Sequence, residues 1–186
     1  MNKLYFISAF LAFVFTSCTE KESVLPENLY NQKANEFVAT LLKYQDFNCN
    51  CVIEPRHTLL DYMKIERPTG NMEKVIMKWT NIKSQEVKDS LNTLSKQVNL
   101  NTTIIKSGYK LISARLADSI VRIKDRDERI QVMDSLCPKG FMTLSKPFFN
   151  KSMDTVFIQI DNMPYSCLSM PISFYYYLNN DWIINY

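Results

Sequence analysis

The last third of the chain constrains the fold most, because four runs of strand-forming residues follow one another there. The runs are FMTLSKPFF, TVFIQI, ISFYYYL and WIINY, and they are rich in β-branched and aromatic residues. Turn-forming residues separate them at positions 150–152, 161–162 and 179–181. Because connections this short join antiparallel strands, the pattern predicts a C-terminal antiparallel sheet of three to four strands.

Strand alternation assigns the side chains of this sheet to two faces. An apolar set is expected to face the helices and form the core: Met142, Leu144, Val156, Ile158, Ile160, Phe174, Tyr176 and Leu178. An aromatic set is expected on the outer face, away from the helices: Phe141, Phe157, Tyr175 and Tyr177. Polar residues lie among the aromatic set, namely Thr143, Ser145 and Gln159. Such a surface can stack sugars or accept a protein partner. The alternative is that another element of the chain covers it, since aromatic residues favour strands in any case.

The first half of the chain carries helical patterns. Pro26 and Glu27 suit the start of a helix, and a helix is predicted over about 27–45. Its apolar residues recur at helical spacing: Tyr30, Ala34, Phe37, Val38, Leu41 and Leu42. A short helix is expected after Pro55. Ser84 is expected to cap a further helix with an apolar face of Val87, Leu91, Leu94 and Val98.

Weaker patterns occupy the rest of the chain. Residues 73–79, EKVIMKW, carry apolar side chains at every second position and predict a strand, and residues 109–113 predict a short one. Helical spacing returns between 116 and 136, where Pro138 and Gly140 end it. Together the patterns predict an α+β fold, with N-terminal and central helices packed on one face of the C-terminal antiparallel sheet.

The amino-terminal residues indicate export from the cell. An uncharged apolar run at 4–15 has about the length of a signal-peptide core and is too short to span a bilayer. The small residues Thr16 and Ser17 precede Cys18, as cleavage by a signal peptidase requires. The alternative is an ordinary secretory signal in which Cys18 is incidental.

The stretch FTSC at 15–18 resembles a bacterial lipobox, with Phe15 where a branched aliphatic residue is usual. The resemblance implies that Cys18 becomes the mature N-terminus and carries a diacylglyceryl thioether and an N-acyl chain such as palmitate. Each buried methylene contributes about 0.8 kcal/mol, so two or more chains anchor a folded domain durably. We therefore expect the protein at a bacterial membrane, on the periplasmic or surface side of the outer membrane.

This anchor divides the chain into a signal peptide at 1–17, a tether at 18–25 and a single domain at 26–186. The formal net charge is +3, and acidic and basic residues are interspersed, as in RIKDRDERI at 122–130. Such mixing is typical of a solvated helix face. It excludes a continuous basic stripe of the kind that binds nucleic acid, so no nucleic-acid partner is expected. The chain has only three glycines, which leaves no Gly-rich phosphate loop.

Four cysteines remain once Cys18 is lipidated: Cys49, Cys51, Cys137 and Cys167. An even number in an exported domain favours disulfides, and the sequence leaves all pairings open. One or two bridges are expected to tie the first helix to the C-terminal sheet. The alternative is a metal site of Cys49, Cys51 and His57, with Glu54 between them. It lacks the paired spacing of a structural zinc site, so we expect neither a metal nor another cofactor.

A family resemblance rests on the last eighty or so residues. The stretches KLISARLADSI, CPKGFMTLSKPFFNKSMDTVFIQID and NNDWIINY resemble a family of uncharacterised Bacteroidota lipoproteins. Members carry a Ser-Lys-Pro-x-Phe-Asn strand, an alternating strand, a Cys- and Gly-rich turn and a final strand opening with Trp. Here the turn, MPYSCLSMP, holds one cysteine and no glycine. The resemblance implies an envelope location and brings no established activity.

No catalytic residues are indicated, because the chain has no Gly-x-Ser-x-Gly elbow and its one Ser-x-x-Lys run has no partner motif. The sequence therefore favours a non-enzymatic binding or structural module of the cell envelope, with a membrane contact through its anchor and a protein or glycan partner. The alternative is a lipid-anchored hydrolase whose site is assembled from residues far apart in the sequence.

Overall fold

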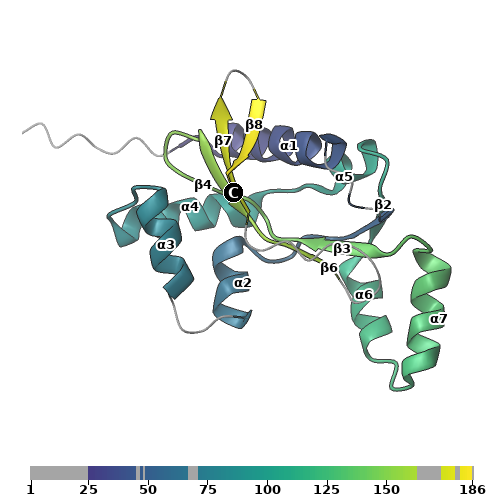
Figure 1. Cartoon of the computed structure of the whole chain (residues 1–186). Helices are drawn as coiled ribbons and strands as arrows, with labels where there is room; N and C mark the ends of the chain where they lie inside the picture. Colours follow the sequence, from purple (N-terminus) through teal and green to yellow (C-terminus); the bar gives the residue numbers. More distant parts are fainter. Residues whose placement is uncertain are drawn as a thin grey trace, which may run out of the picture.

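The structure, a computed structural model, describes residues 25–44, 47, 49–66, 71–162, 173–178 and 181–185 (Figure 1). Within these ranges there are seven helices: α1 (Glu27–Tyr44), α2 (Leu59–Glu66), α3 (Asn71–Trp79), α4 (Gln85–Gln97), α5 (Asn101–Lys106), α6 (Ala114–Val121) and α7 (Arg126–Leu136). The same ranges hold eight strands: β1 (Cys51–Ile53), β2 (Lys110–Ile112), β3 (Phe141–Leu144), β4 (Phe148–Phe149), β5 (Thr155–Ile158), β6 (Ile160–Asn162), β7 (Ser173–Leu178) and β8 (Asp181–Asn185). The predicted α+β class is confirmed.

Most helix boundaries follow from local chemistry. The first helix starts after Pro26, and the side chain of Ser84 accepts a hydrogen bond from the Val87 amide at the start of α4, as predicted. The strand predicted at 73–79 is wrong, because these residues lie in α3. A spacing of four residues fits a helix as well as a strand. Val75 and Trp79 share the exposed face of α3, while Ile76 is buried.

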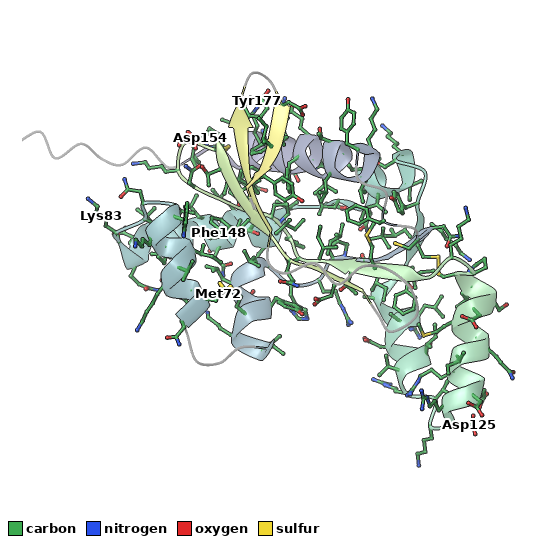
Figure 2. The ribbon with its side chains drawn as sticks, in the orientation of Figure 1. Met72, Lys83, Asp125, Phe148, Asp154 and Tyr177 are labelled. Carbon is green, nitrogen blue, oxygen red and sulfur yellow. A yellow bond between two sulfur atoms is a disulfide. The ribbon has the colours of Figure 1, made fainter. Side chains whose placement is uncertain are left out.

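The helical residues between 116 and 136 form two helices instead of one continuous helix. Arg122 ends α6, and the Asp125 carboxylate accepts a hydrogen bond from the Glu128 amide at 2.8 Å to start α7. An aspartate at this position satisfies an amide that would otherwise lack a partner, so a new helix begins there. The result is a helical hairpin of α6 and α7, whose tip lies far from the sheets (Figure 2, Asp125).

The strands form two sheets of four. The antiparallel sheet has the order β4-β5-β7-β8 and lies wholly in the C-terminal third, as predicted. The mixed sheet has the order β2-β1-β3-β6, in which β1 runs parallel to β2 and β3, and β3 runs antiparallel to β6. The sequence patterns did not predict this second sheet. Its strands β1 and β2 have three residues each, too few to establish a period of two.

A bent hairpin connects the two sheets. The segments β3–β4 and β5–β6 each pass from one sheet to the other, and the bend falls at Ser145 and Gln159. The Ser145 amide donates to the Gln159 carbonyl, and the Gln159 amide donates to the Ser145 hydroxyl, both at 2.9 Å. Both residues are buried, so these bonds satisfy polar groups where the strand ladder is interrupted.

The main core lies where α1 and α4 cover the sheets. The Tyr30 hydroxyl donates to the Pro147 carbonyl at 3.1 Å and accepts from the Phe149 amide at 3.2 Å. The Ser95 hydroxyl donates to the same Pro147 carbonyl at 2.8 Å. Burial raises the pKa of Tyr30, which keeps this hydroxyl neutral and available as a donor. One buried phenol thus connects the first helix to the start of β4.

Helices cover the mixed sheet on both faces. Alternate residues of β1 point to opposite sides: Val52 belongs to the main core, whereas Cys51 packs with Ala117 of α6 in a second, smaller cluster. In β3, Met142 and Phe141 divide in the same way. A sheet with parallel strands is usually buried on both faces, and the α6–α7 hairpin supplies the second cover.

Candidate functional site

The four aromatic residues predicted on an exposed face lie mostly in the interior. Phe141, Phe157 and Tyr175 are only 6%, 4% and 3% exposed, and Tyr177 is partly buried. The outer placement predicted for Phe141, Phe157 and Tyr175 is wrong. Phe141 instead packs beneath α6 and α7, Phe157 belongs to the main core, and Tyr175 contacts α1.

Strand register explains the burial of Tyr175. Tyr175 pairs with Val156 across β5 and β7, and cross-strand partners share a face. Tyr175 therefore lies on the core side with Val156, and its ring packs edge-on against Phe37 with centroids 5.1 Å apart. Tyr177, two residues on, has the Lys33 ammonium 4.6 Å from the centroid of its ring. The prediction assumed that β5 and β7 pair one residue out of this register; the side chains of Phe174, Tyr176 and Leu178 lie outside the described part.

The cysteines divide between the two clusters. Cys51 and Cys137 form a disulfide that links β1 to the end of α7, 86 residues apart, and not the first helix to the C-terminal sheet. Cys49 is buried in the main core. Cys18 and Cys167 lie outside the described residues. Since Cys51 is in a disulfide, it offers no thiolate to the alternative metal site with Cys49 and His57. Among the described residues no cluster of three metal-binding side chains occurs.

A pocket of ≈ 130 Å³ lies between the mixed sheet and the α6–α7 hairpin. Its floor is Ile53 of β1, Ile112 of β2 and Phe141 of β3. The remaining apolar lining comes from the hairpin: Ala117, Ile120, Val121, Met133 and Leu136. The disulfide closes one end through Cys137. We call this space the hairpin pocket.

An ion pair stands at the mouth of the hairpin pocket. The Arg56 guanidinium binds the Asp118 carboxylate through two hydrogen bonds, of 2.8 and 2.9 Å. These bonds, and the positive charges of Arg56 and Arg122, hold the pKa of Asp118 below its ordinary range. The two side chains are 43% and 45% exposed, so the pocket opens to solvent on this side. Thr143 is the other polar side chain in its described lining.

Glu54 positions the helix that carries Asp118. Its carboxylate accepts hydrogen bonds from the Asn101 side chain at 3.0 Å and from the Ala114 amide, the first residue of α6, at 3.1 Å. These bonds lower the pKa of Glu54. The Ser113 side chain caps the same helix by accepting from the Leu116 amide. Two side chains therefore fix the start of α6 above the mixed sheet.

The other wall of the pocket is held differently. None of the residues of α7 is fully buried, and its apolar contact with the smaller cluster comes from the partly buried Met133 and Leu136. Its end is attached to β1 by the Cys51–Cys137 disulfide, and the Lys110 ammonium donates to the Leu136 carbonyl at 2.9 Å. A covalent bond therefore adds to a modest apolar contact in holding α7 over the sheet.

A second hollow, of ≈ 120 Å³, lies between α1 and the β7–β8 hairpin. Its described lining includes Tyr44, which is 69% exposed, together with Trp182 and Asp181. Thr40 adds a hydroxyl, and the deeper side is Phe37, Leu41 and Tyr175. We call it the aromatic hollow.

Sequence patterns alone do not reveal either site. Arg56 and Asp118 are 62 residues apart, and neither belongs to a motif. Comparison with family models, with curated proteins and with solved structures finds no match to this chain. None of the helices in the described part is long and apolar enough to cross a membrane.

Proposed function

We propose that this protein is a lipid-anchored cell-envelope module that binds a small apolar ligand in the hairpin pocket. The observation that carries the proposal is the pocket's lining, which is apolar apart from Arg56, Asp118 and Thr143 in its described part. Apolar cavities of about 150 Å³ in other proteins stay dry and bind benzene. A space of ≈ 130 Å³ therefore suits a single ring or a short chain. The lipobox-like ending at Cys18 supports the envelope location.

The alternative is a lipid-anchored hydrolase. A hydrolase needs a nucleophile and a base that converge on a pocket. In the hairpin pocket the two ionisable side chains are Arg56 and Asp118, and they neutralise each other. The only hydroxyl in its described lining, Thr143, lies within hydrogen-bond reach of the Asp161 main-chain carbonyl, which is not a base. The geometry favours binding over hydrolysis.

The binding proposal is tested by methyl NMR of the full chain in nanodiscs, titrated with 1-hexanol. We expect saturable shifts at the methyls of Ile53, Ile112 and Ile120, with little change at Ile76 in the main core. Shifts spread evenly over the protein, or confined to the main core, would overturn the proposal. The variant Ala117→Leu, which fills the pocket, should abolish the response. A folded Ala117→Leu that still binds would also count against it.

The anchor is tested separately through Cys18. We expect Cys18→Ala to remain unprocessed or to leave the membrane fraction, and to lose labelling by a radioactive fatty acid. Cys49→Ala is the matched control, since it removes a thiol without touching the lipobox-like stretch. Membrane binding and lipid labelling of Cys18→Ala at the parental level would show that Cys18 is not the anchor.

A second candidate function is glycan binding at the aromatic hollow. An exposed tyrosine, a tryptophan and a carboxylate beside each other are the groups that stack on a sugar ring and bind its hydroxyls. Glycan-array binding that depends on Tyr44 would support it. Tyr62→Phe, a change far from the hollow, is the control. An array in which Tyr44→Ala matches the parent would remove this candidate.

A further inference from the structure

Several charged side chains lie around the mouth of the hairpin pocket. Arg56 binds Asp118 from the loop after β1. Arg115 of α6 and Arg122, the residue that ends this helix, line a surface hollow together with Asp118. Glu54 also attracts Arg56, but its carboxylate accepts hydrogen bonds from Asn101 and Ala114.

Of these arginines, Arg56 is the one that stands at the opening of the apolar space. Arg56 and Asp118 both line the pocket, so a ligand held inside would reach the guanidinium with its outer end. A guanidinium recognises a carboxylate through two parallel hydrogen bonds, and Asp118 already uses that geometry. Exposed ion pairs contribute little to stability, so an incoming carboxylate can replace Asp118 at small cost.

We infer that the hairpin pocket takes a small organic monocarboxylate, whose apolar body fills the space beneath α6 and α7 and whose carboxylate replaces Asp118 on Arg56. The body has about six carbon atoms, by analogy with the benzene-sized ligand of a similar cavity. This inference rests on the proposed binding function and adds the chemical class of its ligand. Asp118 then acts as an internal competitor that holds Arg56 in place when the pocket is empty.

Three probes of equal length distinguish this inference from the proposal on which it rests. Hexanoate, 1-hexanol and hexylammonium are titrated into the full chain in nanodiscs, with the free probe concentration measured, and binding is followed at the Ile53 and Ile120 methyls. We expect hexanoate to bind most tightly and hexylammonium most weakly. Equal binding of hexanoate and 1-hexanol would support the pocket as a binding site but would overturn the carboxylate inference. If none of the three binds, the proposed function itself is wrong.

Two variants with exposed side chains test the exchange at Arg56. Asp118→Asn removes the competitor, so hexanoate should bind roughly two- to fivefold more tightly, as expected for the loss of an exposed ion pair. Arg56→Gln should weaken hexanoate binding about tenfold and leave 1-hexanol unchanged. Arg126→Gln at the distant tip of the hairpin removes the same charge and should have little effect. Weaker hexanoate binding by Asp118→Asn, or equal losses for Arg56→Gln and Arg126→Gln, would overturn the inference.

Discussion

The two faces of the mixed sheet are covered in different ways. On one face, Val52 and Met142 join the main core, in which Phe37 of α1 contacts three rings of the antiparallel sheet, those of Phe149, Tyr175 and Trp182. On the other face, α6 and α7 enclose a pocket, α7 has no buried residue, and a disulfide holds it. Dense aromatic packing stabilises the fold through buried contact area. A covalently held hairpin provides a stable frame around an unfilled space.

The largest effect on stability is expected from truncating an aromatic residue of the densely packed main core. Tyr175→Ala should lower the free energy of unfolding by about 3–5 kcal/mol, because a large buried ring leaves a cavity beside Phe37. Urea denaturation followed by circular dichroism measures it. Tyr44→Ala in α1 is the control and should change stability by less than about 0.5 kcal/mol, since Tyr44 is exposed. Equal losses in the two variants would mean that Tyr175 is not a core residue.

The next largest effect on stability is expected from removing the disulfide that attaches α7 to β1. Replacing Cys51 and Cys137 together by alanine should lower the free energy of unfolding by about 2–4 kcal/mol, because the bridge no longer restricts the unfolded chain. Hydrogen exchange should show faster exchange for the amides of α7 than in the parent, with those of α1 nearly as protected as before. Unchanged exchange in α7 would show that packing, and not the disulfide, holds the hairpin over the sheet.

A smaller effect is expected at the start of α6. Glu54→Ala removes the acceptor of the Ala114 amide and should cost about 1 kcal/mol at pH 7. The folded state lowers the pKa of Glu54 below its ordinary value of about 4.3, so its stabilisation is present above that pH. It is lost as the pH falls through the folded pKa.

Denaturation of both proteins at pH 7 and pH 3 measures this contribution. The difference in free energy of unfolding between the parent and Glu54→Ala should decrease at pH 3. Asp134→Ala, which removes an exposed carboxylate of α7, should show no such difference at either pH. A difference for Glu54→Ala that increases in acid would contradict the stabilising role of the Glu54 carboxylate.

The smallest effect on stability is expected at the pocket mouth. Arg56→Gln should shift the free energy of unfolding by less than about 1 kcal/mol, because both partners of the ion pair are exposed. Thermal unfolding at low and high salt measures it, and the difference should decrease as salt screens the pair. A large loss of stability would mean that Arg56 is structural, and that its effect on hexanoate binding reports misfolding.

The parts of the fold that the sequence predicted correctly have strong local signals. The long amphipathic pattern predicted α1, Ser84 predicted the start of α4, and the four C-terminal runs predicted an antiparallel sheet. The mixed sheet was missed because β1 and β2 are short and pair with strands far along the chain. The face of Tyr175 was assigned wrongly because a one-residue change of register moves every side chain to the other face.

The hairpin pocket could not be predicted for a similar reason. Its floor comes from three strands that are distant in sequence, and its ion pair joins Arg56 to Asp118 across 62 residues. The cysteine count favoured a disulfide but left the pairing open, and tertiary structure selects Cys51 with Cys137. No local sequence pattern indicates which apolar residues line a pocket and which pack against a neighbouring side chain.

The sequence by itself determined the class of fold, the main helices and the composition of the C-terminal strands, because these depend on spacing and capping within a few residues. Only the tertiary structure decided the register of β5 and β7, the two covered faces of the mixed sheet and the space beneath α6 and α7. Those features depend on contacts between segments that the chain separates by tens of residues. Local propensity does not specify contacts between segments far apart in the sequence. Strand pairing, packing and one disulfide establish those contacts in the folded protein.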